Sequence, residues 1–208
     1  MSEDSSQPSW DPLPRDFYLP TARKVAPALL GHFLVRQDRE GPCAGVIVET
    51  EAYLAHDPSC HGYARQTARN RSMYGPPGHA YVYFIYGNHF CFNAVCGPEG
   101  VPEAVLVRAI QPLMGLDLMC QRRKGRRELD WTSGPGRLCE ALHITRPLDG
   151  ADLCNAASPV FIARNPEVLK LRRALGPLVR TRRIGISVAT HWLLRFYLDG
   201  SAWVSKRR

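Results

Sequence analysis

Apolar residues along the chain gather in short segments that are rich in β-branched and aromatic side chains. Such segments, bounded by glycine, proline and polar residues, predict strands. The two segments 81–86 and 89–95 flank Gly87 and Asn88, which predicts a β-hairpin. The other predicted strands are 33–36, 46–53, 104–110, 160–162, 183–186 and 194–197.

Helical signals are fewer. They predict helices from Thr21 to Gly31, over 115–128 and from Gly134 to Ile144. Residues 54–79 are interrupted by glycine and proline and predict a long irregular loop, a kind of segment that is usually functional or disordered. Strands and helices follow no regular βαβ alternation, so the pattern favours a mixed α+β fold. The polar, proline-containing residues 1–16 predict a flexible arm before one domain at 17–208.

The composition narrows the class of protein. A chain of 208 residues suits one domain, and no stretch approaches the roughly 18 apolar residues that a membrane span needs. The first ten residues lack the basic and apolar regions of a secretory signal, so an unexported protein is expected. The net charge of +8 favours a polyanionic partner such as DNA, although solubility alone would also explain it. Seven cysteines without a C-x-x-C pair predict reduced thiols.

Two carboxylates are the first candidate for chemistry. In an extended strand Glu49, Glu51 and Tyr53 point to the same face, because side chains alternate with a period of two. Such a face could be an acid/base site beside the irregular loop. It could equally be a solvated strand face, and the residues alone leave both interpretations open.

Aromatic residues and histidines are the second candidate. Tyr81 and Tyr83 share a strand face, where ordinary packing is the alternative, and Tyr86 at the hairpin turn could wedge between base pairs. His56, Cys60 and His61 match no common zinc spacing, so no metal is expected. The basic residues at 122–127 suit either a solvated helix face or phosphate contact. Nucleotide-binding glycine motifs and the G-x-S-x-G elbow are absent, so no nucleotide cofactor is indicated.

Several segments, taken in order, resemble one family from about Phe17 to Ser205. They are VETEAYL (48–54), RQTARNR (65–71), YVYFIYG (81–87), FCFN (90–93), VLVRAIQP (105–112), TSGPGRLCEAL (132–142), LRFY (194–197) and GSAWVS (200–205). Together these segments resemble the alkyladenine (3-methyladenine) DNA glycosylases. The resemblance implies a curved, mainly antiparallel sheet with flanking helices and a protruding hairpin. It also implies a monomer that needs neither metal nor cofactor.

The resemblance further implies a monofunctional enzyme without lyase activity, which flips a damaged purine from double-stranded DNA and hydrolyses its N-glycosidic bond. By position, Glu51 corresponds to the general base, with Arg108 and the main-chain carbonyl of Ile184 beside the attacking water. The residues that correspond to the base-binding set are Tyr53, His61, Tyr83 and Asn93, and Tyr86 corresponds to the intercalating wedge. A protein of this kind is expected in the cytoplasm with the bacterial nucleoid, or in a nucleus.

The implied chemistry needs only one carboxylate. Loss of a purine builds positive charge on the sugar, which one carboxylate can stabilise while it activates water. An N-alkylated purine is already cationic and needs no second acid, unlike the leaving groups of ordinary glycosidases. The alternatives are a damaged-DNA-binding protein without catalysis and, less favoured, a metal hydrolase that uses His56, Cys60 and His61.

Overall fold

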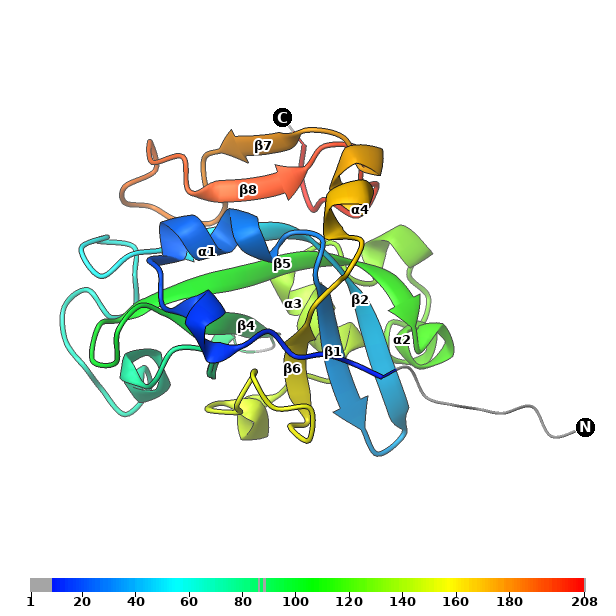
Figure 1. The fold of residues 1–208 in the computed structure, drawn as a ribbon, viewed down its shortest axis with the longest axis horizontal. Coiled ribbons are helices and arrows are strands. Elements are labelled where there is room, and N and C mark those ends of the chain that lie inside the picture. Colours follow the sequence, from blue (N-terminus) through cyan, green and yellow to red (C-terminus); the bar gives the residue numbers. More distant parts are fainter. Residues whose placement is uncertain (1–8, 86, 88, 208) are drawn as a thin grey trace, which may run out of the picture.

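The computed structural model describes residues 9–85, 87 and 89–207. These residues form a curved sheet of eight strands with helices around it (Figure 1). The strands are β1 (Phe33–Asp38), β2 (Gly41–Tyr53), β3 (Ala80–Ile85), β4 (His89–Cys96), β5 (Glu103–Met114), β6 (Val160–Ala163), β7 (Leu178–Thr181) and β8 (Arg195–Leu198). The helices are α1 (Ala22–Leu29), α2 (Leu116–Arg122), α3 (Pro135–Ala141) and α4 (Val168–Ala174), with short 3₁₀ turns η1 (Arg15–Tyr18), η2 (Arg71–Tyr74), η3 (Glu128–Asp130) and η4 (Arg146–Leu148). The predicted mixed α+β class is confirmed.

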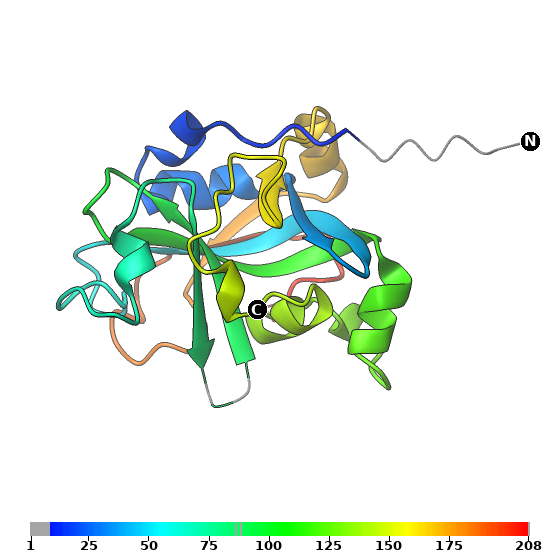
Figure 2. The same cartoon turned by 90° about the horizontal axis from the view of Figure 1, so that it is seen from below.

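Every strand pairing in the sheet is antiparallel. The strand order is β3-β4-β5-β2-β1-β6, and β8 pairs with both β2 and β7. Strands β3 and β4 pair from Ala80↔Ala94 to Ile85↔His89, and Figure 2 shows these two strands extending outward from the sheet. The long strand β2 lies between β5 and β1 and also pairs with β8, so it contacts three other strands of the sheet.

Strand β2 has an irregular register against β5. The pairing shifts at Ala44/Gly45 and on both sides of Glu49. Gly45 is required at the first shift, because a Cβ there would lie 2.5 Å from the carbonyl oxygen of Gln111. Such irregularities twist a strand and redirect its side chains. They occur here in the segment that carries the predicted carboxylates.

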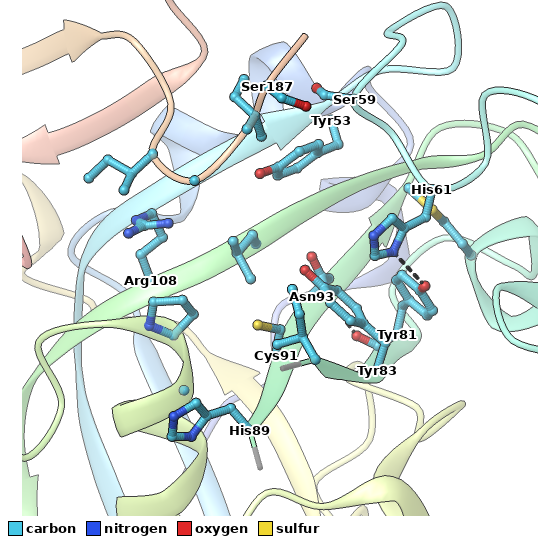
Figure 3. Close-up of a pocket in the computed structure, with 18 of the residues that line it drawn as sticks. Tyr53, Ser59, His61, Tyr81, Tyr83, His89, Cys91, Asn93, Arg108 and Ser187 are labelled. Atoms are coloured by element: carbon cyan, nitrogen blue, oxygen red, sulfur yellow. Dashed lines mark hydrogen bonds between the residues drawn. The ribbon is translucent and has the colours of Figure 1, made fainter. Parts of the chain in front are cut away.

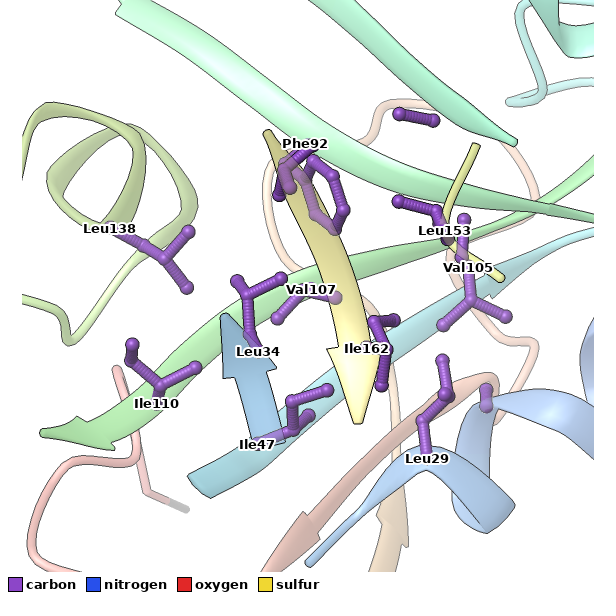
Figure 4. Close-up of a cluster of buried hydrophobic side chains, with 14 of the residues drawn as sticks. Leu29, Leu34, Ile47, Phe92, Val105, Val107, Ile110, Leu138, Leu153 and Ile162 are labelled. Atoms are coloured by element: carbon purple, nitrogen blue, oxygen red, sulfur yellow. The ribbon is translucent and has the colours of Figure 1, made fainter. Parts of the chain in front are cut away.

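The main hydrophobic core lies on one face of this sheet. Helix α1 packs Val25 and Leu29 against it, and Figure 4 shows Leu29, Ile47, Val105, Val107 and Ile162 in the same cluster. The opposite face of β3–β5 carries a second cluster that includes Tyr81, Tyr83 and Leu106. The period-2 alternation of side chains therefore gives β3–β5 one face in the main core and one in the second cluster, which contains the tyrosines.

Two predicted helices are shorter than expected. Helix α2 ends at Arg122. Three residues later Gly125 has a φ of 77°, which a right-handed helix cannot include. Helix α3 ends at Ala141, before His143 with a φ of 51°. Helix α4 was not predicted; none of its residues is fully buried, and Leu171 packs against a small cluster around Val46 and Val48.

The predicted strand at 183–186 is wrong. These residues bend through the loop between β7 and β8, and Gly185 has a φ of 80° that strands do not adopt. The main-chain N–H of Ile184 donates to a side chain, as described below, and not to a neighbouring strand. The apolar alternation of Ile184 and Ile186 reflects a cavity wall, which both residues line.

The described end of the predicted arm packs against the domain. Leu13 is buried, and its N–H donates to the carbonyl oxygen of Ile162 at 2.8 Å. Pro12 bridges to Ala163 of β6, and Arg15 pairs with Asp152 at 2.9 Å. Residues 9–16 are thus held by the fold. None of the helices in the described ranges is long and apolar enough to cross a membrane.

Candidate active site

The two carboxylates of β2 are fully buried. Glu49 and Glu51 each have 0% exposure, which excludes the solvated strand face. Buried carboxylates need charged or hydrogen-bonding partners, because desolvation of an ion costs several kcal/mol. Each of the two has such partners, and the two sets differ.

Glu49 is held by the C-terminal part of the chain. Its Oε1 accepts from Arg108 Nε at 2.8 Å and from Arg195 Nε at 2.7 Å. Ser205 donates its N–H to Oε2 at 2.6 Å and its hydroxyl to Oε1 at 2.9 Å. The guanidinium of Arg195 also lies 4.8 Å from the ring centroid of Tyr197. Glu49 is therefore an internal anchor between β2, β5, β8 and the chain after β8.

Glu51 has partners that line a cavity. Its Oε1 accepts from the N–H of Ile184 at 2.8 Å and lies 3.3 Å from Arg108 Nη1. Its Oε2 accepts from the Tyr53 hydroxyl at 2.9 Å. Tyr53, Arg108 and Ile184 all line the cavity, so the Glu51 carboxylate lies directly behind its wall. The sequence-predicted residues Glu51, Arg108 and Ile184 are thus brought together, and the contact of Ile184 with Glu51 is made by its N–H, whereas the prediction concerned its carbonyl oxygen.

Arg108 bridges the two carboxylates. Burial lowers the pKa of Arg108, but Glu51 and Glu49 outweigh that effect and raise it above its ordinary value. Burial, and then Glu51, raises the pKa of Tyr53 well above its usual range. Tyr53 therefore keeps its proton and acts as a donor to Glu51.

The cavity has a volume of about 480 Å³ and aromatic walls. Figure 3 shows Tyr53 of β2, Tyr83 of β3 and His61 of the 54–79 loop around it. The rings of His61 and Tyr83 are 4.5 Å apart at 72°, and Tyr81 lies 5.3 Å from Tyr83. Cavities of a few hundred Å³ with aromatic walls and few polar groups are typical ligand sites.

His61 is held in place by two contacts. Its Nδ1 is hydrogen-bonded to the Tyr81 hydroxyl at 3.0 Å, and its carbonyl oxygen accepts from Asn70 Nδ2 at 2.7 Å. Burial, with Arg69 adding to it, lowers the pKa of His61, so the imidazole is neutral near pH 7. The sequence reasoning missed Tyr81 and Asn70 as supports, although Asn70 belongs to the RQTARNR segment that carried the resemblance.

Asn93 lines the cavity floor. Its side chain is almost fully buried, and Nδ2 donates to the carbonyl oxygen of Tyr81 at 2.9 Å. That bond orients the amide within the cavity wall. The four predicted base-binding residues therefore line one cavity: Tyr53, His61, Tyr83 and Asn93.

Arg183 is a site residue that the sequence reasoning missed. It precedes Ile184, its side chain is fully buried, and Nη1 pairs with Asp57 and donates to the Ala52 carbonyl at 3.0 Å. Its Cζ lies 4.7 Å from the ring centroid of Tyr53. Burial raises the pKa of Asp57, but hydrogen bonds from Arg183 and Ser59 outweigh this and hold it below its ordinary value. This pair joins the β7–β8 loop to the 54–79 loop.

Several other residues that the sequence singled out do not line the cavity, and one lies outside the described residues. Tyr86 lies outside the described residues. The His56 ring packs 5.7 Å from Trp192, and Cys60 donates to the Pro102 carbonyl at 3.4 Å. In the described ranges no three His, Cys, Asp or Glu residues are grouped to hold a metal ion. The basic residues at 122–127 are largely paired, since Arg122, Arg123 and Arg127 contact acidic side chains.

Comparison with known proteins gives consistent matches over most of the chain. The sequence profile of the "Methylpurine-DNA glycosylase (MPG)" family matches residues 16–202. A relative from Methanoculleus marisnigri is 49% identical over 94% of this chain and 99% of its own length. Relatives from Carboxydothermus hydrogenoformans and Agrobacterium fabrum are 44% and 46% identical over 94% of this chain, covering 99% and 93% of their own lengths. All three are provisionally named 3-methyladenine DNA glycosylases. These matches confirm the resemblance drawn from the sequence motifs.

Proposed function

The chain belongs to the methylpurine-DNA glycosylase family, and on that premise we propose that it excises damaged purines from double-stranded DNA. The substrates are alkylated or deaminated purines, such as 3-methyladenine, 7-methylguanine, hypoxanthine or ethenoadenine. The enzyme flips the nucleotide into the cavity and hydrolyses its N-glycosidic bond with a water molecule activated by Glu51. An abasic site remains in the DNA.

The observation that carries this proposal is the position of Glu51 behind the cavity wall. A carboxylate has about four acceptor positions. The Ile184 N–H uses one on Oε1, where Arg108 Nη1 also lies at 3.3 Å, and the Tyr53 hydroxyl uses one on Oε2. One position on Oε2 is left to accept a water molecule. The three surrounding donors stabilise a negative charge, which in turn favours the positive charge that develops on the sugar as the base departs.

The environment of Glu49 supports a one-carboxylate mechanism. All four donors around Glu49 come from Arg108, Arg195 and Ser205, so this carboxylate is unsuited to protonate a leaving base. A cationic purine needs no such proton. Hypoxanthine is neutral, so its release should be slower.

The aromatic walls support selection of the damaged base. A cationic purine between Tyr53 and Tyr83 would gain about 0.5–2 kcal/mol from cation–π attraction. On the basis of the family motif, Asn93 is proposed to discriminate by its bulk against the amino group of guanine, and its bond to the Tyr81 carbonyl orients its amide. Tyr86 is proposed as the wedge that fills the gap left in the duplex, on the basis of the family motif.

Hydrolysis without strand cleavage is part of the proposal. A lyase reaction needs an amine that attacks the sugar and forms a Schiff base. Among the described residues that line the cavity, none is a lysine. We therefore expect an intact, abasic strand as the product and a monomeric enzyme that acts without metal or cofactor.

The test is single-turnover base release, in chelator, from duplexes that carry 7-methylguanine or hypoxanthine. We expect the wild-type protein to release both bases and Glu51→Gln to release neither while it still binds the damaged duplex. Glu167→Gln, a change at an exposed residue before α4, serves as the matched control and should keep full activity. Binding by the wild type without release of any base would support the damaged-DNA-binding alternative. Release by Glu51→Gln at the wild-type rate would exclude Glu51 as the general base.

A further inference from the structure

We propose that the buried Asp57–Arg183 pair sets how strongly the cavity prefers cationic over neutral purines, and that it does so through the Tyr53 ring. This inference rests on the proposed function. It concerns two residues that do not line the cavity and that no step of the proposed hydrolysis uses.

The guanidinium of Arg183 lies over one face of the Tyr53 ring. The Tyr53 ring lines the cavity, whereas the Arg183 side chain is fully buried and does not. Its Cζ lies 4.7 Å from the ring centroid. A purine stacked on the other face would lie roughly 3.5 Å from the ring, which puts its centre about 8 Å from the guanidinium. At that distance, away from water, a positive charge would repel a cationic base appreciably.

Asp57 cancels that charge. Its Oδ2 pairs with Arg183 Nη1, and both side chains have 0% exposure. Its Oδ1 accepts from the Ser59 N–H at 3.0 Å and from the Ser59 hydroxyl at 2.7 Å, which fixes the carboxylate in place. With the pair intact, the ring of Tyr53 has a neutral group behind it. The cation–π attraction at its front face is then not opposed.

The other buried charges beside the cavity are also balanced. Glu49 and Glu51 are matched by Arg108 and Arg195. Removal of one member of the Asp57–Arg183 pair would therefore leave one net charge behind Tyr53. The sign of that charge depends on which member is removed, and this gives the inference a directional test.

The experiment compares single-turnover release of 7-methylguanine, which is cationic, with that of hypoxanthine, which is neutral. In Asp57→Asn, Arg183 is unopposed, and we expect the ratio of the two rates to fall about tenfold or more below the wild-type ratio. In Arg183→Met, Asp57 is unopposed, and the ratio should rise. The double variant Asp57→Asn/Arg183→Met has no net charge there and should return towards the wild-type ratio.

Structural damage gives a different result. A loosened loop would slow both substrates by the same factor and leave the ratio unchanged, which would overturn the inference while the proposed function stands. Arg183→Lys keeps the charge and should keep the ratio even if both rates fall. If Arg183→Met does not fold, the rate ratios of Asp57→Asn and of the double variant still test the inference. The double variant is expected to fold, because it buries no unpaired charge. No release of either base by the wild-type protein would overturn both proposals.

Discussion

Substitution of Glu49 by Gln should destabilise the fold far more than the same change at Glu51. The change keeps the size of the side chain and removes its charge. In the structure Glu49 accepts hydrogen bonds from two arginines and from both Ser205 donors, all of them buried or partly buried. A glutamine offers one carbonyl oxygen and turns an NH₂ group towards donors, so at least one buried guanidinium loses its counter-charge.

The expected size of the effect follows from those contacts. Breaking a buried ion pair by removing one partner costs about 3–5 kcal/mol, because the remaining charge is buried without compensation. A urea m-value near 2–3 kcal/mol/M is reasonable for a domain of this size, so the midpoint should fall by about 1–2 M. Glu51 accepts from one N–H and one hydroxyl, with Arg108 at 3.3 Å, so Glu51→Gln should cost clearly less.

Urea unfolding at pH 7, followed by tryptophan fluorescence, measures both variants against the wild-type protein. Single-turnover base release under folding conditions then separates stability from activity. We expect Glu49→Gln to be unstable but to retain measurable excision, and Glu51→Gln to be stable but inactive. The reasoning fails if Glu49→Gln unfolds at the wild-type urea concentration, or if Glu51→Gln is the less stable of the two.

Two further predictions concern other parts of the chain. Burial, with Arg172 and Arg164 adding to it, lowers the pKa of His32 from 6.5 to about 4. The free energy of unfolding should therefore be unaffected by His32 above pH 6.5. It should fall by up to about 3 kcal/mol as the pH falls towards 4, because the unfolded chain then binds a proton that the folded one does not. His32→Gln, whose amide oxygen can still accept from the Asn165 N–H, should show a shallower fall in unfolding free energy over that range, and parallel profiles would contradict the assignment. Tyr86→Ala should weaken excision from duplex DNA more than from single strands, measured as the ratio of the two rates; equal losses would count against a wedge.

Much of the sheet could be predicted from the sequence, because its signal is local. The alternation in 81–85 and 89–95 reflects strands whose two faces meet different surroundings, one the main hydrophobic core and the other the cluster that contains Tyr81 and Tyr83. The same local pattern gave a wrong prediction at 183–186, where a strand was expected. There Ile184 and Ile186 alternate because both line the cavity, and only the backbone of Gly185 shows that the segment bends.

The candidate site could be predicted in part, and mostly through the family motifs. Residue spacing alone could not distinguish Glu49 from Glu51, nor decide whether their strand face is solvated or catalytic. Motif positions singled out Glu51, and they also identified the residues that line the cavity. Spacing could not identify Asp57 and Arg183, because they are 126 residues apart and meet only in the folded chain.

The division between the two carboxylates depends on which late segment of the chain covers each of them. Both extend from β2 and both reach Arg108. The segment around Ser205 closes over Glu49 and uses its acceptor positions. The β7–β8 loop contacts Glu51 through the N–H of Ile184 and also forms part of the cavity wall, so this carboxylate lies next to the cavity, where the proposed mechanism needs it. Because residues 184 and 205 are remote from β2 in sequence, the different environments of Glu49 and Glu51 arise only when the last part of the chain has packed.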